Sequence, residues 1–128
     1  MAQVKIYGLK TNIDKNKVQI SKAIHSSLQE IFKLPPEKLF QRFISLSEAD
    51  FIFPDDRTEN YTIIEISIFE GRVIETKKEL IKRIFEDMQE IGISNNDVEI
   101  TIFETPKANW GIRGKPGDEL QLNYKVEL

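Results

Sequence analysis

Apolar and polar residues follow two periodic patterns along the first half of the chain, one typical of strands and one typical of helices. Residues 3–9 alternate between apolar and polar, which predicts a strand with one buried face. Asn12–Asp14 are capping candidates for a helix that Pro35–Pro36 ends. Alternation returns in residues 38–47 and predicts a second strand, covered on most of both faces. The intervening helix has an apolar stripe at spacings of three and four: Ile20, Ala23, Ile24, Ser27, Leu28 and Ile31.

The second half repeats this order of elements. Residues 61–69 alternate and predict a strand, and residues 97–104 predict another. Between them, Thr76 and Glu79 have the spacing of a capping box, and Gly92 marks the end of a helix. The apolar stripe of this helix is Leu80, Ile81, Ile84, Phe85, Met88 and Ile91. A shift of 59 positions superposes the two halves, so we expect one strand–helix–strand unit written twice.

These elements predict an α+β fold in a single domain. Right-handed crossovers make the strands of each unit parallel and leave both helices on one face of a four-stranded mixed sheet. The other face carries many apolar residues, which predicts a symmetric oligomer whose sheets face inward. Residues 118–128 alternate and predict a short C-terminal strand or hairpin that adds to a neighbour's edge. The expected segments are units at about 2–46 and 62–105, a linker at 47–61 and an extension at 106–128.

Composition excludes several classes of function. The 128 residues are 40% hydrophobic and 30% charged, enough apolar material for one core. The formal charge of −3 is spread along the chain, so no basic stripe is available for nucleic acid. The sequence has no cysteine, no export signal and no apolar run long enough for a membrane span. We therefore expect a soluble, cytoplasmic protein.

Metal and phosphate sites find little support in the sequence. His25 is the only histidine, so paired-histidine metal spacing is absent, and its expected place is a helix surface or interface. Residues 55–57 follow a proline and are expected to form a solvated turn. The glycine-rich residues 111–117 do not match a phosphate loop, because Lys115 is followed by Pro116 instead of Ser or Thr. We expect neither a metal nor a cofactor.

Arg72 is the residue that raises a functional question. It closes the sequence Glu70-Gly71-Arg72, where a strand ends and a helix is about to begin. Amides at a helix start point outward, so an arginine there is well placed to bind a carboxylate. The alternative is that Arg72 pairs with a carboxylate such as Glu70 or Glu75, or bridges subunits.

The doubled unit, with Glu-Gly-Arg at a strand end and Trp110 in the sequence NWGIRG, resembles the tautomerase superfamily. The similarity is to its longer, fused type, which includes malonate semialdehyde decarboxylase and cis-chloroacrylic acid dehalogenase, and it covers nearly the whole chain. The resemblance implies cofactor-free proton transfer on a small carboxylate-bearing substrate: keto–enol tautomerisation, or a related decarboxylation or hydration. It also implies a homotrimer, and an N-terminal proline that acts as base, acid or nucleophile beside substrate-binding arginines.

The resemblance assigns these roles to particular residues. Ala2 takes the place of the proline, so removal of Met1 would leave a primary amine there, whereas retained Met1 would make that nitrogen an amide. A free α-amino group titrates near ~8 and is a usable base. Arg72 matches the second of two paired arginines, while the first falls on Glu70 and the family's acid falls on Lys38. Lys38 is either a desolvated base or a surface lysine.

Each of the remaining candidate residues has a functional and a structural interpretation. Tyr7 and Tyr61 can donate to a substrate carbonyl or pack at the sheet rim, and Trp110 with Phe51 or Phe53 can wall a pocket or join subunits. An arginine of the first unit in relatives falls near Asn12, where Lys10 could supply charge instead. A dehalogenase helix histidine aligns near Leu28 or Gln29, so His25 does not inherit its role.

Two functions follow from the sequence. The first is a tautomerase-like enzyme that uses the Ala2 amine and Arg72, with Lys38, Tyr7 and Trp110 as substrate-binding residues. The second is a non-catalytic trimer of the same fold that binds a small molecule or acts as a scaffold, because the N-terminal proline is absent. Fold alone does not decide between them.

Overall fold

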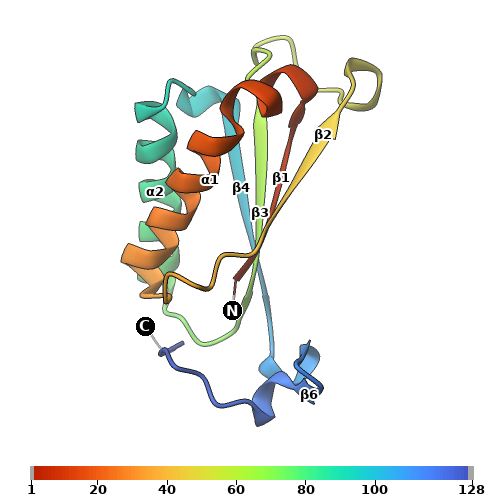
Figure 1. Ribbon diagram of the computed structural model, residues 1–128. Coiled ribbons are helices and arrows are strands. Elements are labelled where there is room, and N and C mark those ends of the chain that lie inside the picture. The colour runs from red at the N-terminus through yellow and green to blue at the C-terminus, as the bar shows by residue number, and fades with distance from the viewer. Residues whose placement is uncertain (1, 127–128) are drawn as a thin grey trace.

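Two strand–helix–strand units are present in the computed structural model, which describes residues 2–126 (Figure 1). The first consists of β1 (Ala2–Leu9), α1 (Lys10–Phe32) and β2 (Gln41–Leu46). The second consists of β3 (Thr62–Phe69), α2 (Ile74–Glu90) and β4 (Val98–Thr105). A small hairpin of β5 (Gly111–Ile112) and β6 (Lys115–Pro116) follows. Short 3₁₀ turns lie at Glu48–Asp50, Asn95–Asp97, Lys107–Asn109 and Gly117–Glu119.

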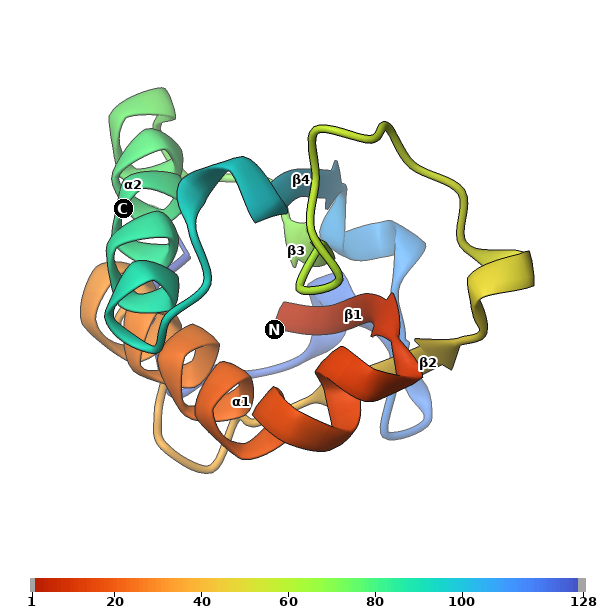
Figure 2. The same ribbon diagram turned by 90° about the horizontal axis from the view of Figure 1, so that it is seen from above.

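The four long strands form one mixed sheet in the order β2-β1-β3-β4. β1 and β2 are parallel, β3 and β4 are parallel, and β1 and β3 are antiparallel at the centre. Both helices cover the same face of this sheet (Figures 1 and 2). The predicted α+β fold, with a mixed four-stranded sheet and two helices on one face, is confirmed.

The core lies between the helices and the sheet. Strands β1 and β3 have the same alternation, in which every second side chain points into this layer and is buried. Isoleucines of both strands meet apolar residues of the helices there, and each such side chain stabilises the fold by about 1.5–3 kcal/mol. The fully buried members are Ile6, Ile20, Ile24, Phe32, Ile64, Ile66, Ile68, Leu80, Ile84 and Met88.

The strand registers show the internal repeat directly. Val4 pairs with Gln41 in the first unit, and Ile64 pairs with Ile100 in the second. The first strands therefore superpose with a shift of 60 positions, and the second strands with the predicted shift of 59. Every residue at the start of β1 thus has a counterpart at the start of β3, at the opposite end of the sheet.

Both predicted capping motifs are wrong. α1 begins directly after β1, with Leu9 at the N-cap position and, among the described residues, no capping side chain. Asn12 therefore lies inside the first turn. α2 begins at Ile74 with Val73 at its N-cap, which puts Thr76 inside that helix. The cap positions therefore fall on the apolar residues Leu9 and Val73.

The C-terminal extension differs from its predicted alternation. A hairpin does form, but at β5 and β6, where Arg113 and Gly114 have the positive φ angles of a two-residue hairpin turn. Within residues 118–126, the described part of the closing segment, there is no strand. Val126 instead forms a small apolar cluster with Phe69, and Leu122 and Tyr124 pack against this cluster. Residues 127 and 128 lie outside the described part of the chain.

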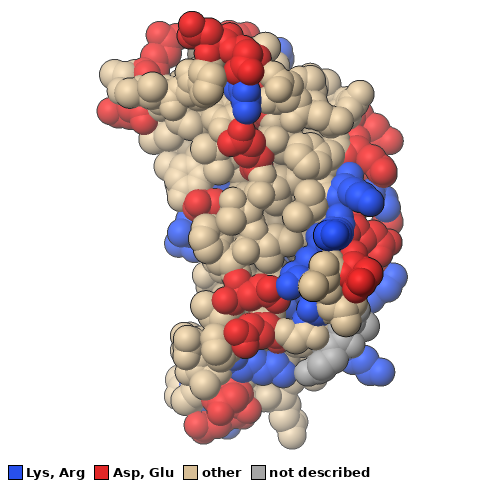
Figure 3. Space-filling model, turned by 180° about the vertical axis from the view of Figure 1, so that it is seen from behind, with Lys and Arg blue, Asp and Glu red and all other residues tan. Residues whose placement is uncertain are grey.

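The sheet face away from the helices is open (Figure 3). The alternation of each strand places Tyr7, Ile63 and the 46% exposed Phe103 on it. Lys5 and Glu65 lie on the same face as direct neighbours, so it is less uniformly apolar than the sequence predicted. Strand β2 is an edge strand with half-buried and exposed residues, and the prediction that most of both its faces are covered is wrong.

Candidate functional site

Ala2 and Arg72 lie at the same end of the sheet. Ala2, the first residue of β1, pairs with Ile68 near the end of antiparallel β3. Arg72 follows Ile68 by four residues, in the turn that leads into α2. Figure 1 shows the start of β1 beside this turn. The two residues that the resemblance singles out are therefore brought to one place by the strand pairing.

The opposite end of the sheet holds the residues that correspond in sequence to Ala2 and Arg72. With the shift of 60 positions that relates the first strands, these are Thr62 and Asn12. The Asn12 Nδ2 donates a hydrogen bond to Thr62 Oγ1 at 2.9 Å. Asn12 lies in the first turn of α1, whereas Arg72 lies in the loop before α2, so the two ends of the sheet differ in local structure.

Arg72 is only 5% exposed. Its guanidinium carbon lies 4.1 Å from the centre of the Phe32 ring, and its Nη1 donates to the Phe69 carbonyl at 3.4 Å. Gly71 precedes it with φ 132°, a backbone conformation that favours glycine and turns Arg72 inward. Glu70 and Glu75, the carboxylates considered as its partners, are exposed. A desolvated cation over an aromatic ring is stabilised by roughly 2 kcal/mol.

Trp110 and Lys38 belong to the same end. The Trp110 ring lies edge-to-face on Phe69 at 5.1 Å, and its Nε1 donates to Thr105 Oγ1 at 2.6 Å. Lys38 is half-buried in the connection just before β2, and parallel pairing brings that connection next to the start of β1. The structure thus gathers four of the five predicted site residues.

Tyr7, the fifth, lies elsewhere. It is five residues beyond Ala2 in β1, about 16 Å along the strand, and points to the open face. Its hydroxyl donates to Glu65 Oε1 at 2.9 Å, and this bond, followed by burial, raises the pKa of Tyr7. Tyr7 is therefore not at the end of the sheet where Ala2 and Arg72 lie.

The other predicted aromatic residues also lie at the far end. Phe51 and Phe53 pack on the Tyr61 ring at 5.5 and 4.9 Å, next to the start of β3. Trp110 contacts the end of β3, about 26 Å away along the strand. Within one chain, Trp110 therefore does not share a pocket with Phe51 or Phe53. Lys10 is at the far end too, where it pairs with Asp14 at 2.7 Å.

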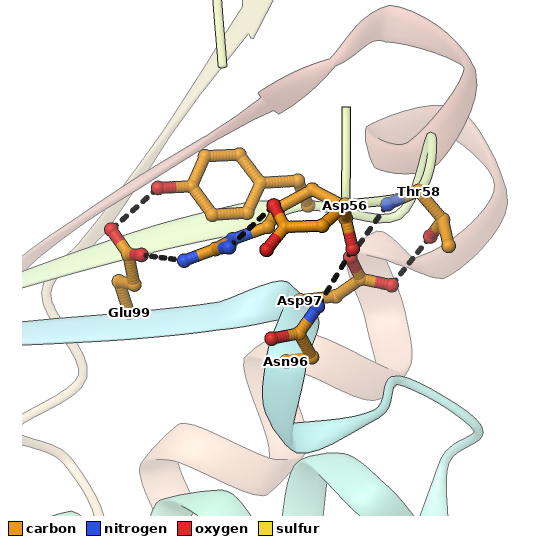
Figure 4. A network of polar contacts seen from close by, with 7 residues as sticks. Asp56, Thr58, Asn96, Asp97 and Glu99 are labelled. Atoms are coloured by element: carbon orange, nitrogen blue, oxygen red, sulfur yellow. Dashed lines mark hydrogen bonds and ion pairs between the residues drawn. The ribbon is translucent and has the colours of Figure 1, made fainter. Parts of the chain in front are cut away.

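The linker of residues 47–61 is tied to β4 by a polar network (Figure 4). Arg57 bridges Asp56 at 2.7 Å and Glu99 at 2.9 Å, and Tyr61 donates to Glu99 at 2.5 Å. The Thr58 hydroxyl donates to Asp97. The pKa of Glu99 is lowered, mainly by the hydrogen bond from Tyr61 and next by that from Arg57. The pKa of Tyr61 is raised to about 12, mainly by burial and next by its hydrogen bond to Glu99. The predicted turn at residues 55–57 is present, with Asp55 and Asp56 exposed, and Arg57 connects it to β4 at the end of the sheet away from Arg72.

Metal ligands are not assembled in the described structure. Among residues 2–126, no group of three or more His, Asp or Glu side chains could hold a metal ion. The half-buried His25 places its Nε2 2.9 Å from the Pro36 carbonyl. Within the same residues, no helix is long and apolar enough to cross a membrane.

A surface hollow of about 380 Å³ adjoins the start of β1. It is lined by Gln3, Leu39, Phe40, Gln41 and Arg42, so it opens at the β2 edge beside Ala2. Another hollow, of about 400 Å³, lies on the outer surface of α2 and contains none of the predicted site residues. Of these two hollows, the first is the one that adjoins the Ala2 end of the sheet.

Sequence reasoning missed the residues that enclose this end. Phe32 and Phe69 contact Arg72, and Tyr124 and Val126 cover Phe69. The only signal for Tyr124 and Val126 was the apolar alternation of the closing segment, which the sequence analysis assigned to a strand.

A doubled strand–helix–strand unit with a buried arginine facing the start of the first strand defines a class of fold and site. The chain belongs to the tautomerase enzyme family, whose model matches residues 38–113. The chain is 37% identical over 57 residues to 2-hydroxymuconate tautomerase of Comamonas testosteroni, which spans 44% of this chain and 90% of that protein. It is 33% identical over 55 residues to a probable tautomerase of Ralstonia nicotianae, spanning 42% of this chain and 79% of that protein. These relatives are thus about half as long as this chain.

Solved structures share the complete fold. FG41 malonate semialdehyde decarboxylase superposes with a TM-score of 0.72 at 27% identity, covering 85% of this chain and 87% of the other. Native fused 4-OT gives a TM-score of 0.81 at 16% identity, covering 92% and 98%. N1, of the cis-3-chloroacrylic acid dehalogenase family, gives 0.76 at 20% identity, covering 91% and 87%. The predicted resemblance to the tautomerase superfamily is confirmed.

Proposed function

We propose that this protein catalyses cofactor-free proton transfer on a small carboxylate-bearing substrate, at the end of the sheet where Ala2 and Arg72 meet. The reaction class is keto–enol tautomerisation or a related decarboxylation or hydration. The observation that supports the proposal is the strand register, which pairs Ala2 with Ile68, four residues before the buried Arg72. Membership of the tautomerase family supports the same class of reaction.

In a mature chain that begins at Ala2, the α-amino group is the base. Such an amine titrates near ~8 in water, so part of it is the free base at neutral pH. It accepts the proton of an enol hydroxyl and returns a proton to the neighbouring carbon. The net reaction is an isomerisation that needs no oxidant or co-reactant.

Arg72 binds the substrate carboxylate in this proposal. A guanidinium binds a carboxylate through two parallel hydrogen bonds, which fixes the orientation of the reacting carbon. Trp110 forms one wall beside Phe69, and Lys38 adds a positive charge at the start of β2. Tyr7 takes no part, since it lies about 16 Å along β1.

The open sheet face supports a homo-oligomer, and we propose a homotrimer. Two structures of fused 4-OT that share this fold, at 17% and 16% identity, are described as trimers. The half-exposed Phe103 and the uncovered edge strand β2 are surfaces that other copies would cover. Analytical ultracentrifugation that finds a stable monomer would contradict this assembly.

A second function is favoured by the burial of Arg72. A side chain that is 5% exposed and already stacked on Phe32 is less accessible than an open substrate site requires. The protein would then be a non-catalytic trimer that binds a small molecule or acts as a scaffold. The primary amine at Ala2, in place of a rigid proline, favours the same alternative.

The experiment that tests these functions begins with the mature N-terminus. Mass spectrometry of protein from its native cell shows whether Met1 is removed, and a retained Met1 rules out the Ala2 amine as base. Turnover of phenylenolpyruvate by trimmed protein is then compared with that of Ala2→Pro and Arg72→Ala. We expect Ala2→Pro to change turnover and Arg72→Ala to lower kcat/KM roughly ten- to a hundredfold, as the loss of a charged hydrogen-bonding partner does.

Arg113→Ala is the matched control, since Arg113 is exposed in the β5–β6 turn. It should retain the activity of the unchanged protein. If neither Ala2→Pro nor Arg72→Ala alters turnover, the enzymatic proposal fails and the binding alternative stands.

A further inference from the structure

The C-terminal strap, residues 120–126, lies across the end of the sheet that contains Ala2 and Arg72. Its last described residue, Val126, is buried against Phe69 at the end of β3. Three residues earlier, the Asn123 Nδ2 donates to Glu37 Oε1 at 3.3 Å, in the connection that precedes β2. The strap therefore reaches from the β2 side of the sheet to the end of β3. Figure 1 shows this part of the chain crossing below the sheet toward the helices.

The order of the strands shows which part of the sheet the strap crosses. β1 lies between β2 and β3, so the start of β1 lies between Glu37 and Phe69. Tyr124 follows Asn123 by one residue and precedes Val126 by two, which puts its Cα within about 8 Å of both. Tyr124 is therefore the strap residue next to the Ala2 end of β1.

Tyr124 is also the strap residue that joins two apolar clusters. Its ring packs against the main core and against the cluster of Phe69 and Val126. Its hydroxyl is excluded from solvent, and no atom of the described residues 2–126 forms a hydrogen bond with it. Buried hydroxyls in native proteins almost always have a partner, because an unpaired one carries the full cost of desolvation. A buried donor without a partner among the described residues, at the end of the sheet that carries the proposed site, can donate to an oxygen of a bound ligand.

We propose that Tyr124 is a substrate-binding residue, whose hydroxyl donates a hydrogen bond to an oxygen of the bound carboxylate-bearing ligand. This inference rests on the function proposed above and adds a third wall to its site. Arg72 binds the ligand from the turn after β3, and Tyr124 binds it from the strap. The strap also limits the ligand to a small molecule, because it covers Phe69 at the bottom of the site. The hydroxyl that the sequence analysis sought in Tyr7 is supplied by Tyr124.

Tyr124→Phe tests the proposal, because it removes the hydroxyl and keeps the ring. The measurements are the Kd of phenylpyruvate, a small keto carboxylate, by isothermal titration calorimetry, and the Tm of the ligand-free protein. We expect the Kd to rise about tenfold, as for the loss of one hydrogen bond to a charged group. The Tm should stay unchanged or rise, since the ligand-free protein loses an unpaired buried hydroxyl.

Tyr61→Phe is the matched control. Tyr61 lies at the start of β3, at the opposite end of the sheet, and its hydroxyl is bonded to Glu99. This variant should have a lower Tm and the Kd of the unchanged protein, the reverse of the pattern expected for Tyr124→Phe.

Failure of this inference can be distinguished from failure of the proposed function. An unchanged Kd in Tyr124→Phe, with weaker binding in Arg72→Ala, overturns the role of Tyr124 alone. A lower Tm of ligand-free Tyr124→Phe overturns it as well, since the hydroxyl would then be bonded within the free protein. If the unchanged protein does not bind phenylpyruvate, or Arg72→Ala binds it equally well, the proposed site is wrong and the role of Tyr124 falls with it.

Discussion

Asn12 allows the structural end of the sheet to be tested separately from the end that carries the proposed site. Its side chain is 1% exposed and takes part in three hydrogen bonds. Nδ2 donates to Thr62 Oγ1 at 2.9 Å and to the Asn60 carbonyl at 3.2 Å, and Oδ1 accepts from Asn16 Nδ2 at 2.8 Å. Asn12→Ala removes all three bonds and leaves the buried Asn16 amide without its acceptor.

The expected loss in the free energy of unfolding follows from the number of hydrogen bonds removed. Each bond contributes about 1 kcal/mol, so Asn12→Ala should lower the free energy of unfolding by about 2–4 kcal/mol. For a domain of this size, such a change lowers the Tm by roughly 10 °C. The loss should be partly shared with Thr62, and a double-mutant cycle with Thr62→Val should give a coupling energy of about 1 kcal/mol.

Urea unfolding followed by circular dichroism measures both quantities, with the m-value as a check that the unfolded state is unchanged. Asn109→Ala is the control, because Asn109 is exposed and should change stability by less than about 0.5 kcal/mol. A loss below about 0.5 kcal/mol for Asn12→Ala, or a coupling energy of zero, would refute the reasoning. Turnover or ligand binding lost along with stability would show that the two ends of the sheet are not independent.

Three further predictions concern the polar network and the C-terminal hairpin. Because the pKa of Glu99 is lowered in the folded protein, its carboxylate stabilises the fold above about pH 4.5, and this contribution is lost as the pH falls through the pKa of the folded state. Glu99→Gln should therefore reduce the loss of unfolding free energy at acid pH, measured by urea unfolding. The pKa of Tyr61, raised from 10.0 to about 12, stabilises the fold below pH 10 and loses that contribution as the pH rises through 12, so Tyr61→Phe should reduce alkaline destabilisation measured by urea unfolding. A side-chain carbon at Gly117 would meet the Lys107 carbonyl oxygen at 2.5 Å and the Trp110 Cβ at 3.1 Å. Gly117→Ala should therefore shift the emission of Trp110, the only tryptophan, and an unchanged spectrum would contradict this packing.

Much of the fold could be predicted because burial imposes a period on the sequence. The alternation of β1 and β3 and the stripes of both helices match the buried positions, and the shift of 59 positions matches the pairing of the second strands. Caps could not be predicted from residue type alone. Asn12 and Thr76 have the chemistry of caps, but the helices begin at Lys10 and Ile74, so the cap positions are Leu9 and Val73.

The site could be predicted in part, for a related reason. Arg72 was found from its motif, and its nearness to Ala2 follows from strand order. Tyr7 and Tyr124 have the same chemistry, and only the topology shows which end of the sheet each occupies. Alternation in the closing segment indicated an extended chain with one apolar side. It could not show whether that side pairs with a sheet edge or packs on Phe69.

The internal repeat gives this protein a freedom that a chain of half its length does not have. In an assembly of identical short subunits, one codon sets a residue at every symmetry-related place, so any substitution is imposed on all of them. Here Arg72 and Asn12 occupy related positions but are encoded separately. A substitution at one end of the sheet therefore leaves the corresponding residue at the other end unchanged, and the Asn12–Thr62 hydrogen bond can be present at one end alone.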